Sequence, residues 1–200
     1  MNIAIILAGG TGTRVGAGRP KQFIEVLGKP VLAYTCEIFQ DNKRIDAIEI
    51  VCHHDWIDYC NEMVEKYNLK KVKWIVPGGE TFQDSVMNGK NHLEKLVGKE
   101  VSLDDNVYIQ YGGAPFTSQK IVDAVIDMTE ERGSAVTGTP CYQLMTIKND
   151  EDNTRTNTWI DRDKYTQIAC PYGFRFSYLL DVYKLSLIHI SEPTRPISIS

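Results

Sequence analysis

Short apolar runs alternate with amphipathic stretches along most of the chain. Runs with the length and β-branched composition of strands lie at 3–7, 47–52, 72–76, 106–110 and 134–138. The first run, Ile3–Leu7, is apolar throughout, which is typical of a strand buried on both faces of a sheet. Helical patterns are predicted at 31–40, 55–67 with Asp55 as N-cap, 81–96, and 118–132 with a stop at Gly133. This alternation predicts an α/β fold with a doubly wound, mostly parallel sheet and right-handed crossovers.

Glycine pairs follow three of the predicted strands. They are Gly9-Gly10, Gly78-Gly79 and Gly112-Gly113. In an open parallel sheet, ligands bind beyond the carboxyl ends of the strands, and glycine allows a backbone to approach a ligand closely. A tight turn explains any single pair equally well, but three pairs at one edge favour a ligand site.

The alternating pattern breaks between residues 141 and 165. Most of this segment is polar and charged, with an apolar piece on either side. We expect a β-arm, a hairpin that projects from the sheet and reaches a second subunit. A disordered loop is the alternative.

The last sixteen residues, LSLIHISEPTRPISIS, do not continue the preceding pattern. Leu185–Arg195 can be back-translated, codon by codon, into a transposase adapter sequence used in sequencing libraries. We therefore interpret 185–200 as a non-native, adapter-derived tail and exclude His189 from the candidate ligands. A single domain is then expected over residues 1–184, incomplete at its C-terminus.

Composition narrows the class of protein. Hydrophobic residues make up 42% and charged residues 24% of 200 residues, which is ordinary for a soluble domain. A formal net charge of −4 argues against a nucleic-acid partner, and no apolar stretch reaches the roughly 20 residues of a membrane span. The five cysteines are scattered without a CxxC motif, and no secretory signal precedes the first strand, so a cytoplasmic location is expected.

The opening stretch IAIILAGGTGTRVGAGRPKQF has the chemistry of an anion site. Glycines after a buried strand let backbone N–H groups point at phosphate oxygens, and Arg14 and Lys21 add positive charge. It is not a dinucleotide fingerprint, because Val15 stands where GxGxxG needs its third glycine, which disfavours an NAD-dependent oxidoreductase. It is not a P-loop either, because Gly-Lys-Ser/Thr is missing.

Three motifs carry a resemblance to a known family. They are LAGGTGTRVGAGRPKQF, PGGETFQDSVMNG (77–89) and WIDRDKY (159–165). These motifs resemble the cytidylyltransferases that act on 2-C-methyl-D-erythritol 4-phosphate or on ribitol 5-phosphate. The resemblance implies a Rossmann-like nucleotidyltransferase fold, CTP and a small polyol phosphate as substrates, Mg²⁺ as cofactor, and a homodimer formed through the arm.

The resemblance also implies roles for particular residues. Lys21 and Arg14 match the catalytic cations on the triphosphate, and Arg162 matches the arginine that binds the acceptor's phosphate from the neighbouring subunit. The remaining nucleotide-binding positions form the triphosphate cradle and the cytosine-reading turn: Leu7, Ala8, Gly9, Gly10, Thr11, Gly12, Gly78, Gly79 and Ser85.

The chain departs from the family pattern at three places: after the fourth predicted strand, at position 82, and at 169–172. Tyr111 stands where the resemblance implies the Mg²⁺ aspartate, and Ala114 and Phe82 stand where it implies arginines. Tyr172 ends the altered stretch Ala169–Tyr172. The metal ligands are therefore unassigned, and His53-His54 fits no common zinc spacing. Two readings stay open: a divergent cytidylyltransferase, or a nucleotide-binding relative with weak or no catalysis.

Overall fold

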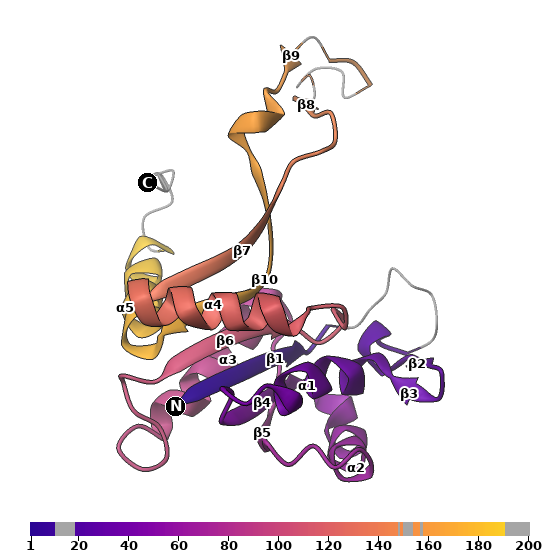
Figure 1. Ribbon diagram of the computed structural model, residues 1–200, viewed down its shortest axis with the longest axis vertical. Helices are drawn as coiled ribbons and strands as arrows, with labels where there is room; N and C mark the ends of the chain where they lie inside the picture. Colours follow the sequence, from indigo (N-terminus) through magenta and orange to yellow (C-terminus); the bar gives the residue numbers. More distant parts are fainter. Residues whose placement is uncertain (11–18, 148, 150–153, 157, 191–200) are drawn as a thin grey trace.

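A six-stranded sheet forms the centre of the computed structural model, which describes residues 1–10, 19–147, 149, 154–156 and 158–190 (Figure 1). In spatial order the strands are β5 (Val72–Pro77), β4 (Ala47–Cys52), β1 (Asn2–Ala8), β6 (Asn106–Tyr111), β10 (Thr166–Arg175) and β7 (Ser134–Pro140). β5, β4, β1 and β6 pair in parallel, whereas β10 is antiparallel to both of its neighbours. The mostly parallel sheet is confirmed, with one antiparallel strand that the sequence pattern did not reveal.

Helices cover both faces of the sheet, which confirms the doubly wound architecture (Figure 1). α1 (Val31–Asp41), α2 (Ile57–Lys66) and α4 (Gln119–Arg132) pack on one face. α3 (Phe82–Lys95) and α5 (Phe176–Ile190) cover the other. The side chains of β1 alternate between the two cores, with Ile6 in one and Ile5 in the other, because successive residues of a strand point to opposite faces.

Capping groups mark the start of α3 and the end of α4, and one predicted cap differs from the structure. Thr81 and Asp84 form a reciprocal capping box at the start of α3, and Gly133 ends α4 with φ at 81°. The prediction of Asp55 as the N-cap of one continuous helix is wrong. A short 3-10 turn, η3 (His54–Trp56), precedes α2, and the side chain of His53 accepts the hydrogen bond from the Asp55 amide at 3.3 Å.

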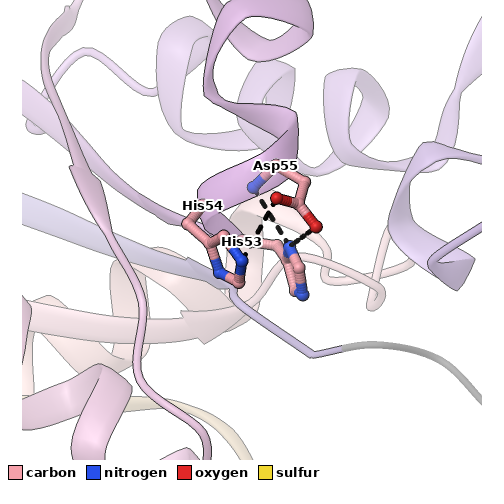
Figure 2. A group of neighbouring side chains, drawn as sticks. All are labelled: His53, His54 and Asp55. Atoms are coloured by element: carbon pink, nitrogen blue, oxygen red, sulfur yellow. Dashed lines mark hydrogen bonds and ion pairs between the residues drawn. The ribbon is translucent and has the colours of Figure 1, made fainter.

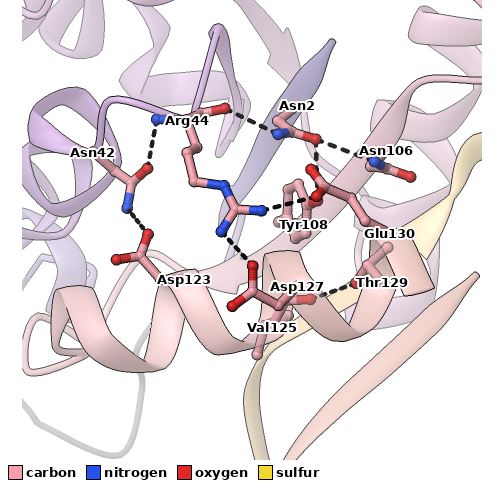
Figure 3. A network of polar contacts seen from close by, with 10 residues as sticks. All are labelled: Asn2, Asn42, Arg44, Asn106, Tyr108, Asp123, Val125, Asp127, Thr129 and Glu130. Atoms are coloured by element: carbon pink, nitrogen blue, oxygen red, sulfur yellow. Dashed lines mark hydrogen bonds and ion pairs between the residues drawn. The ribbon is translucent and has the colours of Figure 1, made fainter. Parts of the chain in front are cut away.

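Polar contacts fasten the amino ends of the strands to α4 (Figure 3). Arg44, just before β4, donates to Asp127 at 2.6 Å and to Glu130 at 2.9 Å. Its carbonyl accepts a hydrogen bond from Asn2 at 3.0 Å. Asp105, just before β6, pairs with the amino group of Met1. These contacts lie at the amino edge of the sheet. The glycine turns lie at the opposite, carboxyl edge.

The remaining elements are short. η2 (Lys21–Phe23) leads to the hairpin of β2 (Glu25–Val26) and β3 (Lys29–Pro30). β7 and β10 continue past the helices into a projecting arm, where β8 (Thr146–Ile147) pairs with β9 (Thr158–Trp159) and η4 (Arg162–Lys164) follows (Figure 1). In the part of the chain that the structure describes, no helix has the length and apolar character needed to cross a membrane.

Candidate active site

The glycine pairs lie together at the carboxyl edge of the sheet. Leu7 of β1 stands in register with Val51 of β4 and Tyr111 of β6, and Cys52 stands opposite Pro77 of β5. The strands therefore end side by side, and the glycine pairs that follow β1, β5 and β6 occupy one edge. This is the edge at which open α/β sheets bind ligands.

Glycine is required at this edge because backbone and side chains approach one another closely. A Cβ placed on Gly9 would lie 2.8 Å from Ser85 Oγ, and a Cβ on Gly78 would lie 3.0 Å from the Gly9 Cα. Ser85, which is 5% exposed, faces both turns and accepts a hydrogen bond from the Gly79 amide at 3.1 Å. Three predicted site segments thus meet: the end of β1, the Gly78-Gly79 turn and the start of α3.

Gln22 is a positioning residue that the sequence did not single out. Its side chain is 3% exposed, and Nε2 donates to the carbonyls of Ala8 at 2.7 Å and Gly10 at 2.8 Å. These bonds fix the two peptides at the start of the glycine loop. The sequence motif that contains Gln22 is the Pro-Lys-Gln-Phe segment. Of that segment, only Lys21 was assigned a phosphate-binding role from the sequence.

Lys21 lies against the turn that follows β6. A Cβ placed on Gly113 would lie 3.0 Å from Lys21 Cε, so the absence of a side chain at 113 makes room for the lysine stem. Lys21 begins η2 and is exposed, which leaves its ammonium group available to an anion at the carboxyl edge. The structure therefore brings Lys21 to the same edge as Gly9, Gly10 and Ser85.

One residue of the expected site, Arg162, does not join this group, and three others are not among the described residues. Thr11, Gly12 and Arg14 lie outside the described residues, and their roles stay predictions. Arg162 lies on the arm, in η4, and donates from Nη1 to the Tyr142 carbonyl at 2.8 Å (Figure 1). Because the arm projects away from the sheet, this arginine does not reach the glycine turns of its own chain.

Aromatic side chains occupy the other half of the edge. The ring centroids of Phe82 and Tyr111 are 5.4 Å apart, and those of Tyr111 and Tyr172 are 6.2 Å apart, both pairs edge to face. The hydroxyl groups of Tyr111 and Tyr172 lie 3.2 Å apart, and burial together with this contact raises the pKa of Tyr172. Three of the positions that depart from the family pattern are therefore in direct contact, although they are far apart in the sequence.

The donors at residue 111 do not fit the Mg²⁺ that the family pattern implies. Mg²⁺ prefers anionic oxygen ligands, and a phenol that shares a hydrogen bond with a second phenol does not supply one. The carboxylate of Asp84, on the first turn of α3, is engaged by Thr81 through its amide at 3.1 Å and its hydroxyl at 2.7 Å. We therefore assign no metal seat to this part of the edge.

A group of three potential metal ligands follows β4: His53, His54 and Asp55 (Figure 2). The two imidazole rings stack with centroids 4.4 Å apart, and His54 Nε2 lies 3.1 Å from the Asp55 carboxylate. His53 Nδ1 is already used to cap the Asp55 amide. These contacts within the group account for its geometry as the cap of η3.

An ionisable pair, one member buried and the other partly exposed, joins α3 to the sheet. Glu49 of β4 is fully buried and lies 2.5 Å from His92 Nδ1. Burial raises the pKa of Glu49 to about 7, and the hydrogen bond to Glu49 raises the pKa of His92. Gly89 makes room for the carboxylate, since a Cβ there would lie 2.9 Å from Glu49 Oε2. The pair joins the last turn of α3 to β4, away from the glycine turns.

A doubly wound sheet with glycine turns at its carboxyl edge and a lysine beside them is typical of α/β proteins that bind phosphate-bearing ligands. The family model of 2-C-methyl-D-erythritol 4-phosphate cytidylyltransferase (IspD) matches residues 2–194. The chain therefore belongs to this family and is by class a CTP-dependent cytidylyltransferase, as its sequence motifs had indicated.

The chain is similar to enzymes that are named for two different acceptor substrates. Ribitol-5-phosphate cytidylyltransferase of Streptococcus agalactiae serotype V is 39% identical over 184 residues, which cover 91% of this chain and 74% of the relative. 2-C-methyl-D-erythritol 4-phosphate cytidylyltransferase of Clostridium acetobutylicum is also 39% identical over 184 residues, covering 92% and 76%. In the fold, 4-diphosphocytidyl-2C-methyl-D-erythritol synthase of Anaerococcus prevotii superposes with a TM-score of 0.76 at 24% identity, over 99% of this chain and 80% of that structure.

Proposed function

We propose that this chain transfers CMP from CTP to a sugar-alcohol phosphate, either ribitol 5-phosphate or 2-C-methyl-D-erythritol 4-phosphate, and releases pyrophosphate. The observation that carries the proposal is the meeting of Gly9, Gly78 and Ser85 beside Lys21 at the carboxyl edge of the sheet. Membership of the cytidylyltransferase family and the two kinds of relative support the choice of substrates.

The reaction needs alignment and positive charge more than covalent help. An oxygen of the acceptor phosphate attacks the α-phosphorus of CTP and forms a new P–O bond. The bond between the α-phosphorus and its bridging oxygen breaks, and pyrophosphate leaves with the electron pair. In this proposal the backbone of the glycine loop and the ammonium group of Lys21, joined by Arg14, stabilise the charge that grows on the phosphates.

The turn at Gly78-Gly79 and the hydroxyl of Ser85 read the cytosine in this proposal. Backbone N–H and C=O groups together with one hydroxyl can match the donor and acceptor pattern at the edge of a pyrimidine. Ser85 is already oriented by the Gly79 amide, so its position is set before a nucleotide arrives. The Mg²⁺ dependence stays an expectation, and it requires a seat other than Tyr111.

We further propose that two copies of the chain, in the cytoplasm, pair through their arms. Large apolar side chains on the arm are exposed: Tyr142 to 74%, Leu144 to 78% and Trp159 to 73%. Covering them with a second copy buries apolar surface, which favours association. The arm would then carry Arg162 to the acceptor side of the partner's site, which its own chain does not reach.

The alternative function is nucleotide binding with weak or no catalysis. The observation that favours it is Tyr111, a residue with no carboxylate, at the position where the resemblance implies the Mg²⁺ aspartate, on an edge that carries the glycine turns. In that case the protein binds CTP but transfers nothing to either acceptor.

A pyrophosphate-release assay distinguishes the two functions. CTP, Mg²⁺ and the protein are incubated with ribitol 5-phosphate, with 2-C-methyl-D-erythritol 4-phosphate, or without acceptor, and the cytidine diphosphate product is identified by mass spectrometry. We expect release that depends on one of the two acceptors. Absence of release with both acceptors, in a protein that binds CTP, would establish the alternative.

A further inference from the structure

Three aromatic side chains from separate elements meet where the strands end. Phe82 begins α3, Tyr111 ends β6 and Tyr172 lies in β10. Their rings pack edge to face in a row, with Tyr111 in the middle and its hydroxyl 3.2 Å from that of Tyr172. We call this group, consisting of these three residues, the aromatic wall.

Tyr172 packs against the core beneath α3 and α5, whereas Phe82 and Tyr111 belong to neither core. Phe82 is 43% exposed and Tyr111 is 38% exposed, although aromatic side chains are usually well buried when they serve only packing. The rings hold one another in place while leaving ring surface open to solvent. Exposed apolar surface that is ordered by its own contacts is typical of a binding site.

The aromatic wall adjoins the glycine turns. Phe82 and Ser85 are three residues apart on α3, so their side chains lie on one face of the helix. Ser85 Oγ faces the Gly9 and Gly78 backbones. On the other side, Tyr111 stands in register with Leu7, and the amide of Gly112 donates to the Leu7 carbonyl at 2.8 Å. A ligand that reaches Ser85 and Gly79 therefore has the aromatic wall as its neighbour.

We propose that the aromatic wall binds the nucleobase of the nucleotide by ring stacking, with Phe82 as the contact and Tyr111 and Tyr172 as its support. This inference rests on the nucleotide site of the proposed function. The base is the planar group among the proposed substrates, and an open-chain polyol phosphate has no face that stacks on a ring. Stacking on an aromatic side chain tolerates any base, because every base has a π face. Selection of cytosine is then left to the hydrogen bonds at Gly79 and Ser85.

Binding of CTP and UTP to Phe82 variants tests this inference by isothermal titration calorimetry. Phe82→Leu keeps an apolar side chain but removes the planar ring, and we expect Kd to rise about tenfold for both nucleotides alike. Phe82→Trp keeps a ring and is expected to bind as the wild type does. Its added indole should also be quenched by CTP beyond the change in the wild type, which has three tryptophans of its own.

Matched variants separate stacking from packing. Tyr178→Leu removes an aromatic ring that is 50% exposed on α5, away from the carboxyl edge, and should leave both Kd values unchanged. Tyr111→Phe keeps the ring but loses the hydroxyl contact with Tyr172, and a change of about twofold is expected from loss of support. Thermal melting of each variant confirms that it is folded at the temperature of the titration.

Defined results overturn the inference. Unchanged Kd values in folded Phe82→Leu exclude stacking on Phe82, and equal losses in Phe82→Leu and Phe82→Trp indicate a packing role. A loss confined to one nucleotide points to edge recognition in place of stacking. Because the readout is binding, a wild type that binds CTP but transfers nothing contradicts the proposed reaction and leaves this test intact. A wild type that binds neither nucleotide overturns both.

Discussion

The two halves of the carboxyl edge differ in what they offer a ligand. The glycine side, made of Gly9, Gly78, Gly79 and Ser85, is packed so closely that most side chains larger than hydrogen would collide. The aromatic side, made of Phe82, Tyr111 and Tyr172, presents rings of which two are well exposed and only Tyr172 packs against a core. Close packing therefore restricts which residues can stand on the glycine side. The aromatic side has room for side chains of different size and chemistry.

The largest effect is expected at Lys21, whose ammonium group adds positive charge beside the glycine side. Lys21→Ala should lower kcat/KM for CTP about 100-fold, because a charge that stabilises the transition state is lost. Lys99→Ala removes an exposed lysine from the loop after α3 and should leave the rate unchanged. Steady-state pyrophosphate release measures both. Equal rates in Lys21→Ala and the wild type would contradict the role given to the glycine side.

The second effect concerns the close packing of the glycine side. In Gly79→Ala the new Cβ would lie 2.1 Å from the Asp84 Cβ, so the turn must shift, and we expect a loss of about 2 kcal/mol in the free energy of unfolding. Gly10→Ala is the matched control, since a Cβ there has no described atom within 4 Å. Urea unfolding measures both variants. A Gly79→Ala protein as stable as Gly10→Ala would show that the packing is looser than described.

A smaller effect is expected for base selection. Ser85→Ala removes the hydroxyl that accepts from the Gly79 amide, and the preference for CTP over UTP should fall about tenfold, the upper range for one hydrogen bond. The ratio of kcat/KM values for the two nucleotides measures the preference. Phe82→Leu, in contrast, should weaken both nucleotides in parallel. If Ser85→Ala kept the full preference, cytosine would have to be read elsewhere.

The smallest effect is a pH dependence of stability that comes from Glu49 and His92, the pair that joins α3 to β4. The pKa values of Glu49 and His92 are raised in the folded chain, so the folded chain binds more protons than the unfolded one above pH 4.5. The stabilisation is complete below pH 4.5 and is lost as the pH rises through about 7. Between pH 5 and 8 the wild type should lose on the order of 1 kcal/mol more stability than Glu49→Gln, because the variant lacks both the raised pKa of Glu49 and the hydrogen bond that raises the pKa of His92.

Urea unfolding at several pH values checks this slope. Glu62→Gln, which changes an exposed carboxylate on α2, is the matched control and should keep the wild-type slope. Parallel curves for the wild type and Glu49→Gln would mean that Glu49 titrates normally.

The strands and helices of the nucleotide half were predictable because their patterns are local. A continuous apolar run marked β1, β-branched runs marked β4, β5 and β6, and the glycine pairs after β1, β5 and β6 located the carboxyl edge. β10 was missed because it follows the polar arm and pairs with strands far away in the sequence, so that no local alternation marks it.

The site was predictable in the same unequal way. Gly9, Gly78, Ser85 and Lys21 were identified from motifs, and the structure brings them together. The aromatic wall could not be predicted, because the sequence shows three separate substitutions and only the register of β6 and β10 joins two of them. The interpretation of residues 185–200 as an adapter-derived tail, the roles of Thr11, Gly12 and Arg14, and the homodimer stay predictions.

The most direct test of the central claim is to map CTP on the protein by backbone amide chemical shifts in NMR. We predict that the amides of Gly9, Gly10 and Gly79 move most on titration with CTP, together with those of Tyr111 and Gly112. The amides of the amino-edge network around Arg44 should not move. Saturable CTP binding that leaves the glycine amides unshifted would contradict the account.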